Sequence, residues 1–235
     1  MYKTKPCFRC HMPSDAPLNV LALNASLKHE PALSNTGELA ALVLDEMGAL
    51  APIAANAVRL SDATLPVGLG FREGADDDWP NLVTQIKTAD IVLFCTPIWW
   101  GGRSSLIQRV IERLDALDEE YSATGRSAIK GKVAGIVITG SEDGALSVMG
   151  SIMMVLTWMG FTLPPECTAY WVGEVGQPTS LDREKRLQNM ATRHMAKSLA
   201  QNLIYYARLL KAHPQTLVPG KAVCCEKHAN LEAPA

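Results

Sequence analysis

Residues 89–102 read ADIVLFCTPIWWGG and combine an apolar run with an aromatic turn. The run from Ile91 to Cys95 is continuously apolar, which is typical of a strand buried on both faces of a parallel sheet. We expect this strand to end in a Thr-Pro turn, before two tryptophans and a helix over residues 104–117. Ligands of open α/β sheets bind beyond the carboxyl ends of the strands, so the tryptophans are expected beside a flat ligand. The alternative is a pair of core tryptophans.

The rest of the chain repeats this alternation of strand and helix. Apolar runs predict strands over residues 18–23, 56–60, 91–95 and 132–139, and a fifth within 162–172. Helical spacing predicts helices over 36–47, 80–88 (with Asp78 as N-cap), 104–117, 145–159 and 181–210. This order predicts one α/β domain over residues 18–211 with a doubly wound, five-stranded parallel sheet. Residues 1–17 are expected to form a flexible arm, and residues 212–235 a disordered tail.

Composition excludes several classes of function. The chain has 235 residues, 48% of them hydrophobic, and a net charge of −2, which offers no electrostatic attraction for nucleic acid or an anionic membrane. No apolar run reaches the length of a membrane span. The first residues lack the apolar core of a signal peptide, so we expect a cytoplasmic location.

Six cysteines do not form a disulfide scaffold in a chain of this length. Cys95 and Cys167 fall at or near strands and are expected to be buried apolar fillers. The other four lie near the two ends, together with two histidines: Cys7, Cys10, His11, Cys224, Cys225 and His228. A zinc site joining the ends is one interpretation, but one C-x-x-C motif is weak evidence, so we predict solvated tails and no metal.

The loop after the first strand contains hydroxyl groups and leads into a helix. Ser26, Lys28, Ser34, Asn35 and Thr36 lie in it. The amides and dipole of a helix N-terminus attract an anion, and Lys28 adds a positive charge, so we expect a phosphate here. The alternative is that Ser34 or Asn35 only caps the helix.

Two further loops are expected at the same edge, because all loops that follow parallel strands gather there. The loop after residues 91–95 offers Trp99 for stacking on a planar ring, with Trp100 serving packing or a subunit interface. Its candidate residues are Thr96, Pro97, Ile98, Trp99, Trp100 and Gly101. The loop after residues 132–139 has glycines that permit close backbone approach to a ligand, although it is equally compatible with an ordinary strand-to-helix turn. Its candidate residues are Thr139, Gly140, Ser141, Glu142, Asp143 and Gly144.

An anion pocket, a stacking surface and a polar glycine loop side by side describe a site for a phosphate-tethered aromatic cofactor, and FMN fits best. Other nucleotide and hydrolase motifs do not match. Residues 125–132 have one residue too many for a Walker loop, and the glycines at 68, 70 and 74 miss the dinucleotide spacing. Residues 139–144 do not have the spacing of a nucleophile elbow.

Three segments in the right order resemble the flavodoxin-like NAD(P)H-dependent FMN reductases. They are residues 23–28 with 34–36, residues 89–101, and residues 131–144. The resemblance implies a three-layer α/β/α fold with strand order 2-1-3-4-5 and FMN at the switch point. It also implies that Ser26, Ser34, Asn35 and Thr36 hold the phosphate, and that residues 97–101 and 139–144 frame the ribityl chain and isoalloxazine. Residues 170–174, YWVGE, recur in similar proteins without an assigned role here.

The implied activity is an FMN-dependent oxidoreductase with NAD(P)H as co-substrate. Hydride chemistry belongs to flavin N5, so no protein residue is assigned a catalytic role, and backbone amides of the second and third loops stabilise charge near N1 and O2. We expect a ping-pong cycle with a quinone, a nitro or azo compound or a similar small acceptor. The alternatives are a flavodoxin-type electron carrier, or a flavodoxin-fold regulatory module without turnover. The near-neutral charge argues against the carrier, which docks through a charged patch.

The helix over residues 145–159 is apolar and rich in methionine, including Met149, Met153, Met154 and Met159. Such a stripe is typical of core or of a subunit interface. Together with exposed tryptophans it predicts a homodimer or homotetramer.

Overall fold

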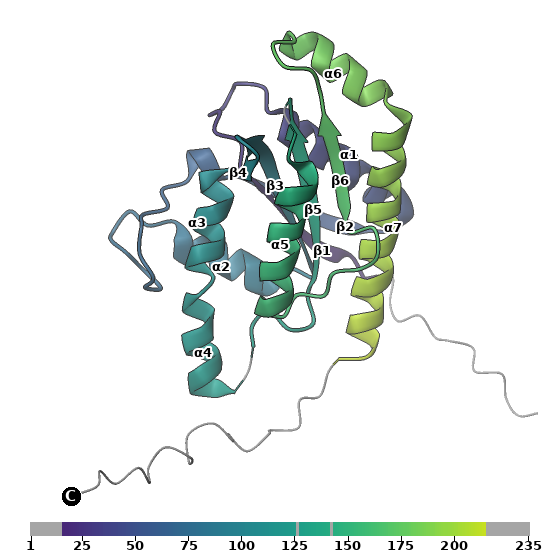
Figure 1. The fold of residues 1–235 in the computed structure, drawn as a ribbon. Coiled ribbons are helices and arrows are strands. Elements are labelled where there is room, and N and C mark those ends of the chain that lie inside the picture. The colour runs from purple at the N-terminus through teal and green to yellow at the C-terminus, as the bar shows by residue number, and fades with distance from the viewer. Residues whose placement is uncertain (1–15, 126, 142, 215–235) are drawn as a thin grey trace, which may run out of the picture.

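One parallel sheet between two helical layers forms the molecule (Figure 1). The computed structural model describes residues 16–125, 127–141 and 143–214. The strands are β1 (Leu18–Asn24), β2 (Ile53–Arg59), β3 (Ile91–Trp99), β4 (Gly102–Arg103), β5 (Val133–Gly140) and β6 (Thr168–Val172). The helices are α1 (Asn35–Leu50), α2 (Trp79–Thr88), α3 (Ser105–Arg113), α4 (Ala116–Thr124), α5 (Ala145–Met159), α6 (Thr179–Gln188) and α7 (Met190–Ala212), with a 3-10 turn at Leu60–Asp62.

The strand order is β2-β1-β3-β5-β6, and all these pairings are parallel. Counting only these five strands along the chain, the order is 2-1-3-4-5, so the predicted flavodoxin-like α/β fold is confirmed. The order reverses between β1 and β3, which places a switch point at the carboxyl ends of these two strands.

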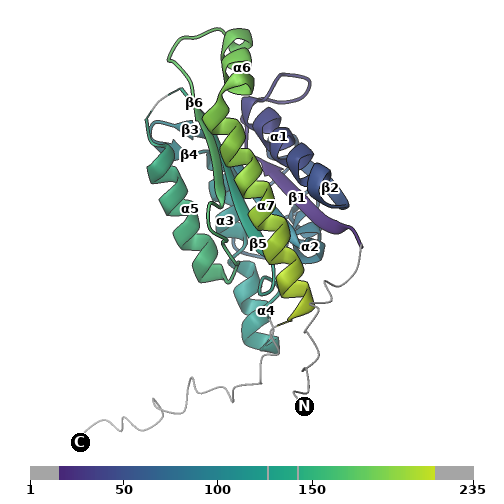
Figure 2. The same cartoon turned by 90° about the vertical axis from the view of Figure 1, so that its right-hand side faces the viewer.

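Apolar side chains cover both faces of the sheet, as the continuous apolar runs predict. On one face, Leu21 and Phe94 pack in a core that includes residues of α2, α3 and α5. On the other face, Val20 and Leu93 pack with residues of α1 and α7, the two helices that lie over this side in Figure 2. The alternation along each strand sends neighbouring side chains to opposite layers.

The prediction that β3 ends at a Thr-Pro turn is wrong. The strand continues through Pro97 to Trp99 and then folds back in a hairpin, pairing with β4. Pro97 is tolerated because the β1 pairing ends at Cys95, so no ladder bond to β1 is lost there. The turn consists of Trp100 and Gly101 with φ of 48° and 73°, the two positive values that a tight hairpin requires.

Two predicted helices are each broken into two. The helix expected over 104–117 ends at Arg113, and α4 follows after a turn with the 3-10-type bond from the Asp115 N–H to the Glu112 carbonyl. The helix expected over 181–210 is interrupted at Asn189, whose extended backbone separates α6 from α7. The Asn189 side chain accepts from the Thr192 N–H at 2.9 Å, so it is the N-cap of α7.

Smaller differences concern element ends. Asp78 occupies the N-cap of α2 but its carboxylate accepts from the Thr64 N–H, while Asp77 accepts from the Trp79 N–H. Strand β2 begins three residues before the predicted start, and β6 covers only the last five residues of the predicted 162–172.

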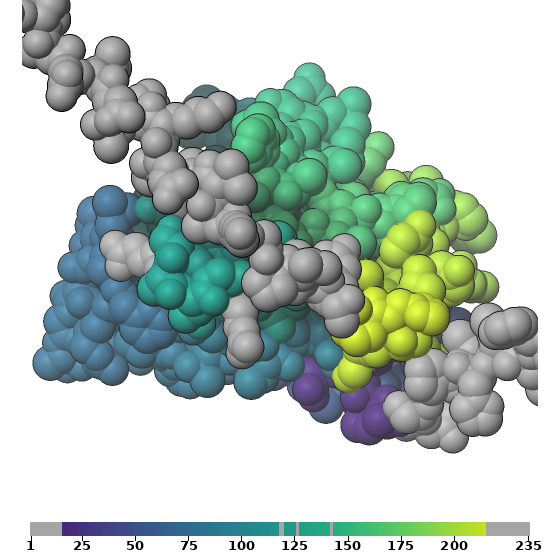
Figure 3. Space-filling view, turned by 90° about the horizontal axis from the view of Figure 1, so that it is seen from below, coloured from purple at the N-terminus to yellow at the C-terminus, as the bar shows by residue number. Residues whose placement is uncertain are grey.

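The edge opposite the switch point brings together the two ends of the described chain. Seen from below, the start of β1 (purple) lies beside the end of α7 (yellow) (Figure 3). The Asp90 carboxylate accepts from the Asn19 N–H and from Lys211 Nζ, both at 2.9 Å. Residues 1–15 and 215–235, which contain most of the predicted arm (1–17) and most of the predicted tail (212–235), lie outside the described residues.

Candidate active site

The three predicted loops meet at the carboxyl edge of the sheet. The hydroxyl of Thr36, in the first turn of α1, lies 2.6 Å from the hydroxyl of Thr139, at the end of β5. A side chain on Gly144 would come within 2.8 Å of the Gly101 backbone, so the β3-β4 hairpin and the loop after β5 are in contact. A Cβ on Gly140 would likewise collide with Ile98, which shows why glycine stands there.

A pocket of about 290 Å³ opens between these loops, at the low end of the ~300–1,000 Å³ typical of small-molecule sites. Ten of the residues predicted for the site line it: Ser26, Lys28, Asn35, Thr36, Pro97, Ile98, Trp99, Thr139, Gly140 and Ser141. The walls therefore offer an exposed cation, several hydroxyls and one half-exposed tryptophan ring.

Two other predicted residues, Ser34 and Thr96, brace the loops instead. The Ser34 hydroxyl is buried and accepts from the Gly37 N–H at 2.9 Å, so the capping alternative describes its contacts. The Thr96 hydroxyl is buried and accepts from the Ser104 N–H at 3.0 Å, which ties β3 to the start of α3. Both side chains are already bonded within the protein and do not line the pocket.

The remaining predicted residues stand beyond the pocket wall. Trp100, 89% exposed, and Gly101 form the hairpin tip, and Gly144 is the N-cap of α5. Asp143 is exposed, and Glu142 lies outside the described residues.

Residues of β6 and of the chain after it complete the pocket, and none of them was predicted for the site. They are Trp171, Glu174, Gly176, Gln177, Thr179 and Asp182, together with Leu27 from the first loop. Only Trp171 and Glu174 fall within the motif at residues 170–174. Helix α6 falls mostly within the helix predicted over 181–210, and nothing in its charged local pattern indicates that Asp182 turns inward.

Asp182 is the centre of the polar network under this wall. Its carboxylate is mostly buried and accepts from Trp171 Nε1 at 2.7 Å, Asn35 Nδ2 at 3.0 Å and Arg186 Nη1 at 2.8 Å. Arg186 is fully buried and also contacts Glu38 of α1 at 2.6 Å. Asp182 therefore fixes the ring of Trp171 and joins α6 to the start of α1.

The two cysteines of the described chain are not reactive groups of this site. Cys95 and Cys167 are buried as predicted, and burial raises the pKa of each thiol above its usual value. Among the described residues no three His, Cys, Asp or Glu side chains are grouped so as to hold a metal ion. The cysteines and histidines near the two ends lie outside this part of the chain.

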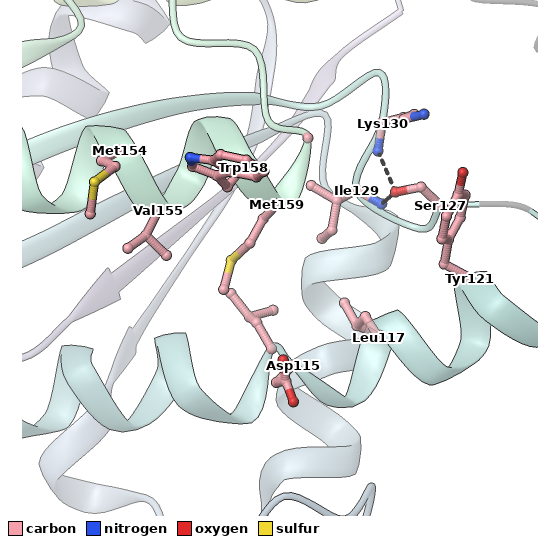
Figure 4. Close-up of a pocket in the computed structure, with 12 residues that line it drawn as sticks. Asp115, Leu117, Tyr121, Ser127, Ile129, Lys130, Met154, Val155, Trp158 and Met159 are labelled. Carbon is pink, nitrogen blue, oxygen red and sulfur yellow. Dashed lines mark hydrogen bonds between the residues drawn. The ribbon is translucent and has the colours of Figure 1, made fainter. Parts of the chain in front are cut away.

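A second hollow of about 690 Å³ lies at the opposite end of α5 (Figure 4). Met154, Trp158 and Met159 of α5 face Leu117 of α4 across it, and the segment before β5 closes one side. Its walls are mainly apolar, with Asp115, Tyr121 and Lys130 among the lining residues, and none of the predicted site residues lines it. The pocket at the switch point is therefore the candidate active site.

Comparison with known proteins agrees with this geometry. Residues 18–174 match the sequence profile of the family described as NADPH-dependent FMN reductase. The chain belongs to this family. Its cofactor is accordingly FMN, with NAD(P)H as the electron donor.

Two curated relatives cover most of this chain. The divalent metal cation transporter MntH of Mycobacterium bovis is 33% identical over 83% of this chain, which spans only 29% of the transporter's length. The 8-demethyl-8-aminoriboflavin-5'-phosphate synthase of Streptomyces davaonensis is 29% identical over 85% of this chain and 80% of its own.

Solved structures show the same FMN reductase fold. The crystal structure of RosB with a bound 8-demethyl-8-formylriboflavin-5'-phosphate intermediate has 27% identity and a TM-score of 0.71, over 84% of this chain and 81% of RosB. The apo form of the NADH:FMN oxidoreductase EMOB has 17% identity and a TM-score of 0.61, over 85% and 93%, and shows likeness of fold alone.

The residues of the pocket fit FMN. The N–H groups of Asn35 and Thr36, which precede the cap bond from Gly37 and the first intrahelical bond from Glu38 to Ser34, are available to an anion next to Ser26 and Lys28. Two carboxamide oxygens of the wall, Asn35 Oδ1 and Gln177 Oε1, are buried without a partner, so the protein alone does not satisfy this site. An anion site, an aromatic ring and unpaired acceptors match a ligand with a phosphate, a planar ring and hydroxyl groups.

Proposed function

We propose that this chain is an NAD(P)H-dependent, FMN-containing oxidoreductase that reduces a small acceptor such as a quinone or a nitro or azo compound by a ping-pong mechanism. The observation that carries the proposal is the meeting of the three loops, through the Thr36–Thr139 contact and the Gly101–Gly144 approach, around one pocket at the switch point. When bound, FMN supplies the two-electron chemistry that the side chains of the pocket cannot.

The protein's part at the phosphate end is to hold an anion. The hydroxyls of Ser26 and Thr36 and the N–H groups of Asn35 and Thr36 provide donors, and Lys28 provides charge. Ser34 contributes indirectly, because its cap bond to Gly37 and its bonds to Asn24 hold the start of the helix in place.

At the ring end the protein positions a planar group. Trp99 and Ile98 come from the strand that leads into the hairpin, and the rigid two-residue turn at its tip keeps the Trp99 ring at the rim. Gly140 has no side chain, so the end of β5 approaches Ile98 closely. Gly140 and Ile98 therefore border the pocket together. In this proposal NAD(P)H and the acceptor enter the pocket in turn, as in a ping-pong cycle.

An absorbance spectrum of the purified protein, before and after FMN and then NADPH, tests this function. We expect flavin bands that bleach with NADPH and return when a quinone is added, with steady oxidation of NADPH. A colourless protein that does not take up FMN contradicts the proposal and favours a flavin-free regulatory module. Bleaching without turnover of any soluble acceptor favours an electron carrier.

A second candidate function is that a flavin 5'-phosphate is the substrate. The relative from Streptomyces davaonensis and RosB, whose names and title refer to modified riboflavin 5'-phosphates, favour it at 29% and 27% identity. Mass spectrometry of the flavin after many turnovers separates the two, because a cofactor keeps its mass and a substrate does not.

We also propose that the chain forms a homodimer or homotetramer through α5. This 15-residue helix has no charged side chain, yet Leu146, Met154 and Trp158 are 67%, 60% and 88% exposed on its outer side. An uncharged apolar face matches itself across a two-fold axis without opposing like charges. The mass measured by light scattering tests this, and a monomer at micromolar concentration contradicts it.

No helix of the described residues has the length and apolar character needed to span a bilayer. We propose a cytoplasmic location, where NAD(P)H is available, and fractionation of cells that express the tagged full chain tests it.

A further inference from the structure

Helix α6 covers one side of the pocket and is held there by charged groups. Its buried residues are Asp182 and Arg186, and none of its apolar side chains is buried. Arg186 joins the Asp182 carboxylate at 2.8 Å to Glu38 of α1 at 2.6 Å, and Glu38 also pairs with Arg183. The contact of α6 with the fold is therefore an ionic one, which can separate without exposing apolar core.

Two carboxamides on this side of the pocket are oriented by carboxylates. Asn35 Nδ2 donates to Asp182 at 3.0 Å, and Gln177 Nε2 donates to Glu174 at 3.1 Å. An ionised carboxylate only accepts hydrogen bonds, so in each amide the nitrogen faces the carboxylate and the oxygen faces away. This settles the orientation of both amides and leaves Asn35 Oδ1 and Gln177 Oε1 as acceptors.

These two oxygens are buried and have no hydrogen-bond partner in the structure. Both residues line the same pocket, one from the first turn of α1 and the other from the segment before α6. A buried acceptor without a donor is unfavourable, so a ligand that brings hydroxyl or N–H groups to both oxygens is selected over one that does not.

We propose that Asn35 and Gln177 recognise the hydroxyl groups of the polyol chain of the flavin nucleotide as α6 closes over it; this inference rests on the proposed binding of FMN. The phosphate is assigned to the first-turn amides of α1, and Asn35 is the first residue of that helix. The groups of FMN next to its phosphate are the chain hydroxyls, which are the donors within reach of that position.

Helix α6 must move to give a ligand access to Asn35 Oδ1 and Gln177 Oε1, because both oxygens are buried in this structure. The segment that carries α6, residues 176–189, is bounded by residues that permit such a movement. Gly176 has φ of 76°, a value that favours glycine, and the extended Asn189 separates α6 from α7. Opening breaks the Arg186–Glu38 pair, and closure over a ligand restores it.

The test compares FMN with a flavin whose side chain is an unbranched alkyl phosphate without hydroxyl groups. Each is titrated into the full chain, and the dissociation constant is taken from the quenching of flavin fluorescence. We expect the wild type to bind FMN at least tenfold more tightly than the analogue. In Gln177→Met, a change of similar length, FMN binding weakens about tenfold while binding of the analogue is nearly unchanged.

Gln188 provides a matched control, because it lies at the exposed end of the same helix and donates to Glu184 at 3.2 Å outside the pocket. Gln188→Met is expected to bind both flavins like the wild type. Asn35→Leu is the second variant and is expected to reduce the preference for FMN as Gln177→Met does. Far-UV circular dichroism establishes that each variant is folded.

Four results separate the possible failures. If Gln177→Met and Asn35→Leu weaken the binding of FMN and of the analogue equally, these side chains serve packing. That result overturns the recognition of hydroxyls. Unchanged hydrogen exchange of the α6 amides on addition of FMN overturns the closure. A wild-type protein that binds neither flavin refutes the proposed function itself, whereas tight binding with no preference refutes only this inference.

Discussion

Replacing Arg113 with methionine tests which contacts hold the loop between β2 and α2. Arg113 is fully buried and donates to the Asp77 carboxylate at 2.7 Å and to the carbonyls of Pro66 at 3.0 Å and Gly70 at 3.1 Å. Its guanidinium also lies 5.3 Å from the centre of the Trp79 ring. Methionine retains most of the volume but removes every donor, so Asp77 is left buried without a cation.

The magnitude follows from the burial of both partners, whose side chains are 0% exposed. Breaking a buried ion pair by removing one partner costs about 3–5 kcal/mol. For a chain of this size each kcal/mol lowers Tm by about 2–4 °C, so we expect Tm to fall by roughly 6–20 °C. Asp77 keeps the N–H groups of Glu73 and Trp79, which favours the lower part of the range.

Thermal and urea unfolding, followed by circular dichroism, measure this loss. Arg109→Met is the matched control, because Arg109 lies one turn earlier on α3, donates to the Leu65 carbonyl and forms no ion pair with the described residues. We expect that variant to lose less than about 1.5 kcal/mol. Adding Asp77→Asn to Arg113→Met should recover part of the stability, because the unpaired charge is removed. Equal losses in the two arginine variants, or no recovery by Asp77→Asn, would refute the reasoning.

Acid sensitivity is expected from the same pair. Burial by itself raises the pKa of the Asp77 carboxyl, but its hydrogen bonds to Arg113 and to backbone N–H groups, with the Arg113 charge, hold that pKa below 3.8. The ionised Asp77 carboxylate contributes its full stabilisation above the unfolded pKa of about 3.9, and this is lost as the pH falls through the folded pKa. The urea midpoint between pH 5 and pH 2 should therefore fall less steeply in Asp77→Asn than in the wild type. Trp99→Ala should raise the dissociation constant for FMN about tenfold, measured by fluorescence quenching, and Trp100→Ala should raise it less; the opposite order would remove Trp99 from the ring site. Met154→Lys should shift the mass in light scattering to that of a monomer, and an unchanged mass would exclude the exposed face of α5 as the interface.

Much of the fold was predictable because burial leaves a local pattern. The run Ile91–Cys95 is apolar without interruption because both of its faces are covered, and the same holds for β5. The extension of β3 past Pro97 was not predictable, because a proline inside a strand is tolerated where its nitrogen faces a side without a paired strand. That condition depends on the pairing with β1, not on the local sequence.

The candidate site was predictable in part for a similar reason. Loops that follow parallel strands must share an edge, so Thr36, Ile98 and Gly140 could be placed together before the structure was known. Whether a hydroxyl in such a loop faces a ligand or the protein depends on its rotamer and neighbours. Ser34 and Thr96 turn inward and accept from backbone N–H groups. A serine or threonine at either position could equally well have faced a ligand.

By itself, the sequence determined the order of strands and helices, the edge where the site lies and the family resemblance carried by residues 23–28 with 34–36, 89–101 and 131–144. The tertiary structure alone decided the far wall of the pocket. Asp182 meets Asn35 across 147 residues of chain, and Gln177 lines the same pocket from the segment before α6. The physical reason is that periodicity records only whether a residue is buried, whereas a hydrogen bond between distant side chains depends on the path of the whole chain.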